Sequence, residues 1–262
     1  MKAVSLIAAA VLVSACTTLG PIPATTGISA VPNDRPGFEA QAAVVPGFFL
    51  SDAATASSEG QPTGQLSMLL EPDRWLGIPG LIAGVLRYGS GSDGAIEPYL
   101  GYRHRFTDVL SLAAIGYGSE AQAAQTLASY RASRLGAEIA ADVRLLQLGT
   151  WVAIHGQVSG AATQLHASGT YCVASDGEGT DCNTDGTPNT FANGRVSGVF
   201  PSGTAQLSLD VGRRPLGVLH DVRFALLVST GEMPQLSFGQ QQSSTSYTSW
   251  GLSLTLGLGD DH

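Results

Sequence analysis

Charged residues are scarce in this 262-residue chain, and lysine is almost absent. Asp, Glu, Lys and Arg make up 13% of the residues, whereas a soluble globular domain carries about 25%. The single lysine is Lys2, so the rest of the chain sets twelve arginines against 21 acidic residues, a balance of −9. This negative balance excludes the basic surface that a nucleic-acid-binding protein needs. The missing lysine also excludes a Walker-type phosphate loop.

Enzyme motifs are absent as well. No serine lies in a G-x-S-x-G pattern, and the five histidines show neither zincin spacing nor a His–Cys cluster of the kind that binds zinc. Residues 89–94 match G-x-G-x-x-G, but an alternating segment follows where a dinucleotide site needs a helix, so we interpret them as a hairpin loop. We therefore expect no enzyme activity and no nucleotide cofactor.

No apolar run is long enough for a membrane-spanning helix, which needs about 20 residues. The most apolar stretch, residues 4–13, follows Lys2 and is typical of a cleavable secretory leader. It ends in Val13-Ser14-Ala15-Cys16, which resembles the lipobox of bacterial lipoproteins. The resemblance implies a signal peptide over residues 1–15 and acyl chains such as palmitate on Cys16. The residue after the cysteine is Thr17 rather than aspartate, which favours the outer membrane.

Residues 16–36 contain several prolines and no hydrophobic periodicity. We predict that they form a lipidated, flexible tether ahead of the folded domain. Only two cysteines remain, Cys172 and Cys182, and an even pair in an oxidising compartment predicts a disulfide that pins a long loop.

The same loop carries a weak calcium pattern. Asp181, Asn183 and Asp185, followed by glycine, match the first half of D-x-[DN]-x-[DN]-G, whose hard oxygen ligands suit Ca²⁺. Ala192 stands where the pattern requires a bidentate glutamate. An Asx-rich turn without a metal is the alternative, so calcium is the one cofactor that the sequence raises.

From Gly37 onward, apolar and polar residues alternate with the period of β-strands. Along residues 134–145, for example, Leu135 and Ile139 fall on one face while Arg134 and Glu138 fall on the other. Ten segments of this kind are predicted as strands: 37–51, 64–72, 80–90, 95–105, 108–118, 130–146, 149–165, 192–211, 217–230 and 246–259.

The predicted connections alternate between long polar loops and short turns. The long set covers residues 52–63, 119–129, 166–191 and 231–245, with 91–94 as a short exception. This alternation resembles bacterial outer-membrane barrels, with both chain ends on the periplasmic side. We predict an all-β, antiparallel up-and-down β-barrel of about ten strands, between eight and twelve, over residues 37–259, with a tail at 260–262. The final residue, His262, departs from the aromatic residue that typically ends such barrels.

The predicted polar face is mostly Ser, Gly, Gln and Thr, with charges of both signs. Two roles fit these charges: the constriction of a pore, or a paired network that fills a closed lumen. A barrel of about ten strands is too narrow for a wide channel, which favours the network. The predicted lumen charges are Glu97, Arg103, Arg105, Arg134, Glu138, Asp142, Arg144, Asp210, Asp221 and Arg223.

The leading hypothesis is a lipid-anchored outer-membrane barrel with a structural, surface-interaction or weak pore role. Its expected partners are membrane lipid, through Cys16 and the barrel exterior, and the outer-membrane assembly machinery; its oligomeric state stays open. One alternative is a soluble, lipocalin-like binding module tethered by Cys16, because a soluble barrel shows the same alternation. The other is an outer-membrane barrel enzyme that acts on lipid A or peptides.

Overall fold

The computed structural model describes residues 18–19, 27–32, 37–50, 63–72, 76–90, 93–124, 128–149, 151–173, 190–211, 219–236 and 243–258. The strands are β1 (Thr18–Leu19), β2 (Phe38–Leu50), β3 (Thr63–Leu70), β4 (Leu81–Ser90), β5 (Asp93–Arg105), β6 (Leu110–Ala124), β7 (Ala128–Leu148), β8 (Val152–Val173), β9 (Thr190–Val211), β10 (Leu219–Leu236) and β11 (Ser243–Leu258). Within these ranges, no helix is long and apolar enough to cross a membrane.

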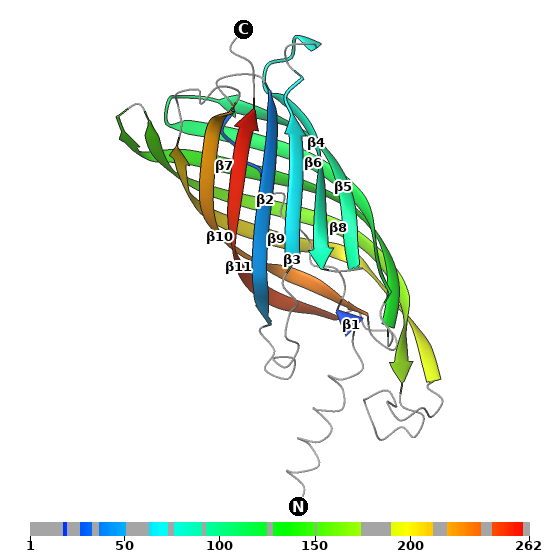
Figure 1. Ribbon diagram of the computed structural model, residues 1–262. Coiled ribbons are helices and arrows are strands. Elements are labelled where there is room, and N and C mark those ends of the chain that lie inside the picture. Colours follow the sequence, from blue (N-terminus) through cyan, green and yellow to red (C-terminus); the bar gives the residue numbers. More distant parts are fainter. Residues whose placement is uncertain are drawn as a thin grey trace, which may run out of the picture.

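Strands β2 to β11 form a closed antiparallel barrel (Figure 1). Each strand pairs with the next in the chain, and β11 pairs with β2 from Leu258↔Phe38 to Tyr247↔Leu50, which closes the ring. The predicted all-β, up-and-down barrel of ten strands is confirmed. The short strand β1 adds to the end of β10, where it pairs with Gln235 and Leu236.

The two ends of the barrel differ in their connections. The connections β3–β4, β5–β6 and β7–β8 lie at the end that we call the turn end, where Phe38 also pairs with Leu258. The opposite end is called the loop end. Gly80 shows how tight a turn-end connection is, because its φ of 84° favours glycine and a Cβ there would lie 2.1 Å from the Arg103 carbonyl oxygen.

Several strands run farther toward the loop end than the periodicity predicts. Strand β6 ends at Ala124 rather than 118, β8 at Val173 rather than 165, and β10 at Leu236 rather than 230. The predicted long loops over 119–129, 166–191 and 231–245 are therefore partly strand. Backbone pairing needs no apolar face, so hydrophobic periodicity marks only the part of each strand that has one.

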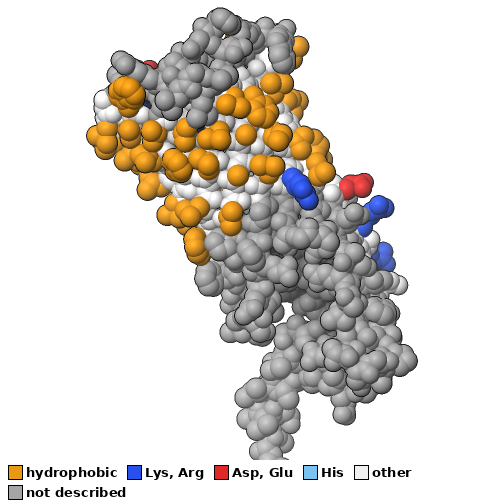
Figure 2. Space-filling view, viewed as in Figure 1, with side chains coloured by type: hydrophobic (Ala, Val, Ile, Leu, Met, Phe, Trp, Pro, Cys, Tyr) orange, Lys and Arg blue, Asp and Glu red, His pale blue; other side chains and the backbone are white. Residues whose placement is uncertain are grey.

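Outward-facing side chains form an apolar belt around the barrel, part of which Figure 2 shows. The exposed members include one large side chain on most strands: Val44, Met68, Val85, Leu100, Ile139, Val158, Leu207, Leu226 and Leu252. On β7 the belt runs from Leu135 to Leu145. Ten residue steps of about 3.4 Å, tilted by about 40°, rise about 26 Å, which is close to the apolar band of membrane barrels.

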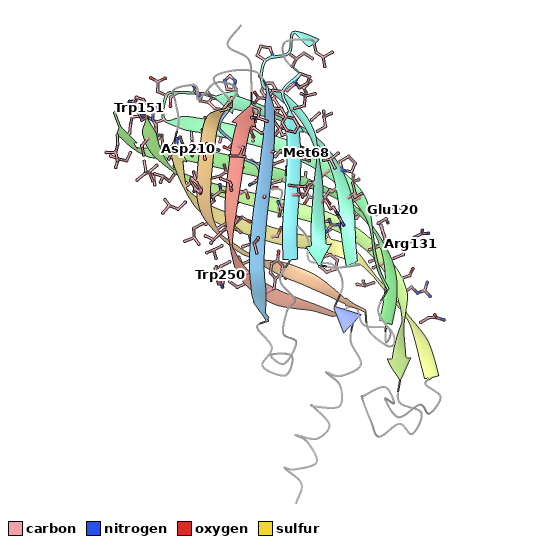
Figure 3. All side chains as sticks on the ribbon, viewed as in Figure 1. Met68, Glu120, Arg131, Trp151, Asp210 and Trp250 are labelled. Atoms are coloured by element: carbon pink, nitrogen blue, oxygen red, sulfur yellow. The ribbon has the colours of Figure 1, made fainter. Side chains whose placement is uncertain are left out.

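Aromatic and charged side chains mark the edges of this belt. Figure 3 shows exposed tryptophans at opposite edges, Trp151 toward the turn end and Trp250 toward the loop end. Glu120 and Arg131 are exposed beyond the loop-end edge. The belt thus has the aromatic margins and charged surroundings that a membrane-embedded surface requires.

Tyrosine rings cover glycines on the inner face of the barrel. A Cβ on Gly84 would lie 2.3 Å from the Tyr99 ring, and a Cβ on Gly136 would lie 2.3 Å from the Tyr117 ring. Both rings belong to one buried apolar cluster. That cluster also contains Ile28, a residue that precedes the barrel in the chain, so the lumen is filled in part by residues outside the wall.

Candidate functional site in the barrel lumen

Residues 27–32 lie inside the barrel, in the half of the lumen nearer the turn end. Gly27, Ile28, Ser29 and Ala30 are all buried. The structure corrects the predicted flexible tether over these six residues, because they pack against the inner wall. Local sequence gives no sign of this placement, since the residues that hold the segment lie far away in the chain.

Two glutamines of the wall bind the backbone of this segment. Gln157 donates a hydrogen bond from Nε2 to the Ile28 carbonyl at 2.9 Å and accepts one from the Ala30 N–H at 2.8 Å. Gln41 donates from Nε2 to the Gly27 carbonyl at 3.0 Å. Buried backbone groups need partners, and these amides supply them in place of a neighbouring strand.

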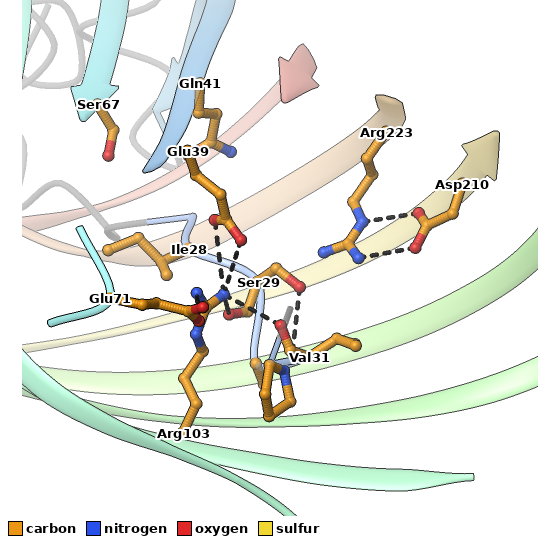
Figure 4. A network of polar contacts seen from close by, with 12 residues as sticks. Ile28, Ser29, Val31, Glu39, Gln41, Ser67, Glu71, Arg103, Asp210 and Arg223 are labelled. Atoms are coloured by element: carbon orange, nitrogen blue, oxygen red, sulfur yellow. Dashed lines mark hydrogen bonds and ion pairs between the residues drawn. The ribbon is translucent and has the colours of Figure 1, made fainter. Parts of the chain in front are cut away.

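Arg103 connects the segment to the wall most extensively (Figure 4). Its guanidinium donates to the carbonyls of Ser29 at 3.2 Å and Val31 at 3.0 Å. It also pairs with two carboxylates, Glu39 at 3.1 Å and Glu71. The Arg103 side chain is fully buried, so one cation compensates two buried acidic groups and two backbone carbonyls.

A second polar group crosses four neighbouring strands near the same end. Arg223 pairs with Asp210 through two parallel hydrogen bonds of 2.6 and 2.7 Å, which Figure 4 also shows. His155 Nδ1 lies 2.7 Å from Asp142 Oδ1, and His155 Nε2 lies 3.6 Å from Asp210 Oδ2. The imidazole therefore lies between two carboxylates, one on β7 and one on β9.

A third group lies farther toward the loop end, in the middle of the lumen. Arg134 and Glu97 form an ion pair of 2.6 Å with both side chains fully buried, and Ser119 bridges them. Tyr117 and Thr163 share a hydrogen bond of 2.7 Å. The partners named here all belong to strands of the wall, and Tyr117 also belongs to the buried apolar cluster that contains Ile28.

Seven of the ten predicted lumen charges face the interior of these layers. They are Glu97, Arg103, Arg134, Asp142, Asp210 and Arg223 in the pairs above, and Glu138, which is buried two inward positions from Arg134. The other three lie near the turn end: Arg105 is exposed and donates to the Pro32 carbonyl at 3.0 Å, and Arg144 and Asp221 are half-buried.

Two carboxylates of the Arg103 site are missing from the prediction. Glu39 lies on β2, where alternation with Gln41 and Ala43 does indicate an inward position. Glu71 follows the last residue of β3, but it lies within the predicted strand 64–72 and continues the inward alternation of Ser67 and Leu69, so the local pattern indicates an inward position here as well.

The remaining predicted sites lie wholly or partly outside the described residues. These are Cys16, Cys182, Asp181, Asn183 and Asp185, while Cys172 is on β8 without a described side chain. The lipidation, the disulfide and the calcium site stay predictions.

The comparisons with known proteins match this chain to solved structures at low sequence identity. No protein-family model matches the chain, and no curated protein matches it. Among solved structures, the chain is similar to the β-domain of the Bordetella autotransporter BrkA, at 13% identity and a TM-score of 0.42, over 86% of this chain and 99% of that one. It is similar to Neisserial surface protein A at 10% identity and a TM-score of 0.34, over 86% and 99%. It is also similar to Ail of Yersinia pestis at 10% identity and a TM-score of 0.27, over 85% and 99%. Because these scores are low, we take the function from this chain's own residues.

Proposed function

We propose that the protein is a lipid-anchored β-barrel of the bacterial outer membrane, with a structural or surface-interaction role and a lumen closed by its own residues. The main support is that the outer face of the barrel is apolar and the inner face is polar and charged. Large apolar side chains point outward on nine of the ten strands β2 to β11, while charged and polar side chains point inward and pair with one another.

The outward belt favours a membrane over water. Ile139 and Leu135 on β7 are each about two-thirds exposed, at 67% and 66%, and exposed large apolar side chains also lie on eight of the other nine barrel strands. A soluble lipocalin-like module has the opposite arrangement, with its apolar face inside and a charged face toward water. Continuous apolar surface of this extent is unfavourable in water but suits lipid chains.

The inner face favours a closed lumen over a pore. The buried charges form short-range pairs, and residues 27–32 occupy the turn-end half of the interior. Inner charges that pair with one another are not available to attract passing ions. We expect wild-type protein to conduct little.

The contacts of His155 bear on the enzyme alternative. Both ring nitrogens face carboxylates, Asp142 at 2.7 Å and Asp210 at 3.6 Å, so neither is directed at a hydroxyl or thiol nucleophile. A catalytic base needs such a nucleophile or an activated water within reach. The geometry favours a structural role for this histidine within the charge network.

The test separates the barrel from its lipid anchor. The Cys16→Ala protein is expressed with a leader that does not direct lipidation, and its membrane fraction is run on a gel with and without boiling. We expect it to stay in the outer membrane and to migrate differently when unboiled. A folded protein in the periplasm would overturn the membrane-spanning barrel and support the soluble module.

Conductance tests the closed lumen. Purified wild-type protein and a variant lacking residues 20–32 are compared in planar bilayers. We expect the deletion to raise conductance because it removes the segment that Gln157 and Arg103 hold. Equal and high conductance of both proteins would support the pore role instead.

A further inference from the structure

We infer that the amino-terminal segment passes through the barrel from the loop end to the turn end, so that Cys16 lies on the cell-surface side of the membrane. The inference rests on the proposed function, because the membrane orientation assigns the long loops to the outside. It adds a route for the segment and a location for the lipid.

The first observation is the place of β1. Strand β10 runs from Leu219 at the turn end to Leu236 at the loop end, and β1 pairs with Gln235 and Leu236. The ladder between β9 and β10 ends at Ser202↔Gly231. Beyond that point, β1 is paired with β10 near its end, so Thr18 and Leu19 belong to the loop end of the wall (Figure 1).

The second observation is the direction of residues 27–32. Gly27 lies near Gln41, and a Cβ on it would be 3.6 Å from the amide of Gln65, only two residues from the loop-end start of β3. Five residues later, Pro32 contacts Arg105, the last residue of β5 at the turn end. The segment therefore advances toward the turn end as the chain proceeds.

The third observation is the start of the barrel. Strand β2 begins at Phe38, which pairs with Leu258 at the turn end. Residues 18–19, 27–32 and 38 thus follow one another from the loop end, through the lumen, to the turn end. The sequence prediction places both chain ends on the turn side; the structure does so for Leu258 and for the start of β2, but not for Thr18.

The short separation of Cys16 from Thr18 along the chain places the predicted lipid at the same end of the barrel as β1. Cys16 is two residues from Thr18, and two extended residues span at most about 7 Å. Short turns face the periplasm in bacterial outer-membrane barrels, while long loops face outward. A diacylated Cys16 is therefore positioned at the outer surface, on the opposite side of the membrane from a lipoprotein that faces the periplasm.

Single-cysteine labelling on intact cells tests the route. In a parent in which Cys172 and Cys182 are replaced by serine, Thr17→Cys is compared with Ser168→Cys and Asp108→Cys. Ser168 is exposed beyond the belt near the loop end, and Asp108 is exposed at the turn end. Each protein is treated with a membrane-impermeant maleimide before and after the outer membrane is permeabilised.

We expect Thr17→Cys and Ser168→Cys to react on intact cells, and Asp108→Cys to react only after permeabilisation. If Thr17→Cys behaves like Asp108→Cys, the inference is overturned while the barrel stands. If Asp108→Cys reacts on intact cells and Ser168→Cys does not, the orientation in the proposed function is reversed, and this inference fails with it. Reaction of the parent itself would show that Cys16 carries a free thiol and is not lipidated.

An epitope tag covers the case in which Thr17→Cys reacts under neither condition. The tag, flanked by short Gly-Ser linkers, is inserted after Thr17 in the wild-type chain, and the same tag is placed after His262 as the control. Antibody binding to the first tag on intact cells, with the second tag detected only after permeabilisation, supports the route. Detection of both tags only after permeabilisation overturns it.

Discussion

The middle and the turn-end half of the lumen both bury charges, but they compensate them differently. In the middle, Arg134 meets Glu97 directly, and both residues come from the wall. In the turn-end half, Arg103 divides its hydrogen bonds between the wall carboxylates Glu39 and Glu71 and the carbonyls of residues 29 and 31. The ion pair in the middle is therefore made by wall residues, whereas the Arg103 site also includes the segment that precedes the barrel strands.

This difference shows what a buried charge requires. Removing one partner from a buried pair is costly because the other charge is left without compensation. An ion pair between wall residues depends on barrel closure, whereas the Arg103 site also couples the segment to the wall. Substitutions in the two layers should accordingly differ in their effects on stability and on conductance.

The largest effect is expected for Arg103→Met. The change leaves Glu39 and Glu71 buried without the Arg103 cation and removes the hydrogen bonds from Arg103 Nη1 to two carbonyls of the segment, so the free energy of unfolding should fall by about 3–5 kcal/mol. Urea unfolding in detergent measures the fall, and planar bilayers should show raised conductance. Arg105→Met is the control, since this exposed residue contacts Pro32 and should change stability by less than about 1 kcal/mol. Equal losses in the two variants would contradict the assigned role of Arg103.

A somewhat smaller loss, of about 3 kcal/mol, is expected for Arg134→Met, because it leaves a single carboxylate, Glu97, without its cation. Adding Glu97→Gln to this variant should recover part of the loss, since the orphaned charge is removed. Conductance should stay near the wild-type value because the segment keeps its contacts. A double variant no more stable than Arg134→Met would show that the pair is not coupled.

A packing change should cost less than either charge change. In Gly136→Ala the new methyl group displaces the Tyr117 ring and weakens its hydrogen bond to Thr163, which lowers the free energy of unfolding by about 1–3 kcal/mol. Gly160→Ala on the adjacent strand meets nothing within 4 Å, so its change should stay within about 0.5 kcal/mol. Thermal shifts of the unboiled gel band would compare the two, and similar shifts would argue against the ring contact.

The smallest change in stability is expected for Gln157→Ala, which removes two hydrogen bonds to the segment and costs about 1–2 kcal/mol. Its effect on conductance should be larger than that of Arg134→Met, even though its effect on stability is smaller. Gln147→Ala is the control, because among the described residues its amide bonds to Gly149 and Val152 at the β7–β8 connection and to Arg144, and not to the segment. Unchanged conductance in Gln157→Ala would show that this side chain does not hold the segment.

The wall of the barrel could be predicted from alternation, and the filling of the turn-end half could not. On β7, the outward residues Leu135, Ile139 and Val143 alternate with inward charged residues. This alternation identifies both faces of the strand, because a membrane barrel needs an apolar outer face. Outside the belt that requirement ends, which is why the outer parts of β8 and β10 appear as loops in the sequence. Gln157, which binds the backbone of residues 27–32, lies more than a hundred residues away in the sequence. The local periodicity of the sequence therefore could not indicate this contact.

The threaded segment also constrains the order in which the molecule assembles. Residues 27–32 are held by β5 and β8, in the middle of the chain, whereas the ring is completed by pairing of its first and last strands, β2 and β11. An acylated chain end is wider than a lumen already packed with side chains. If Cys16 is lipidated, we expect the strands to close around residues 27–32 before β2 and β11 pair, so that the segment is enclosed during assembly rather than inserted afterwards.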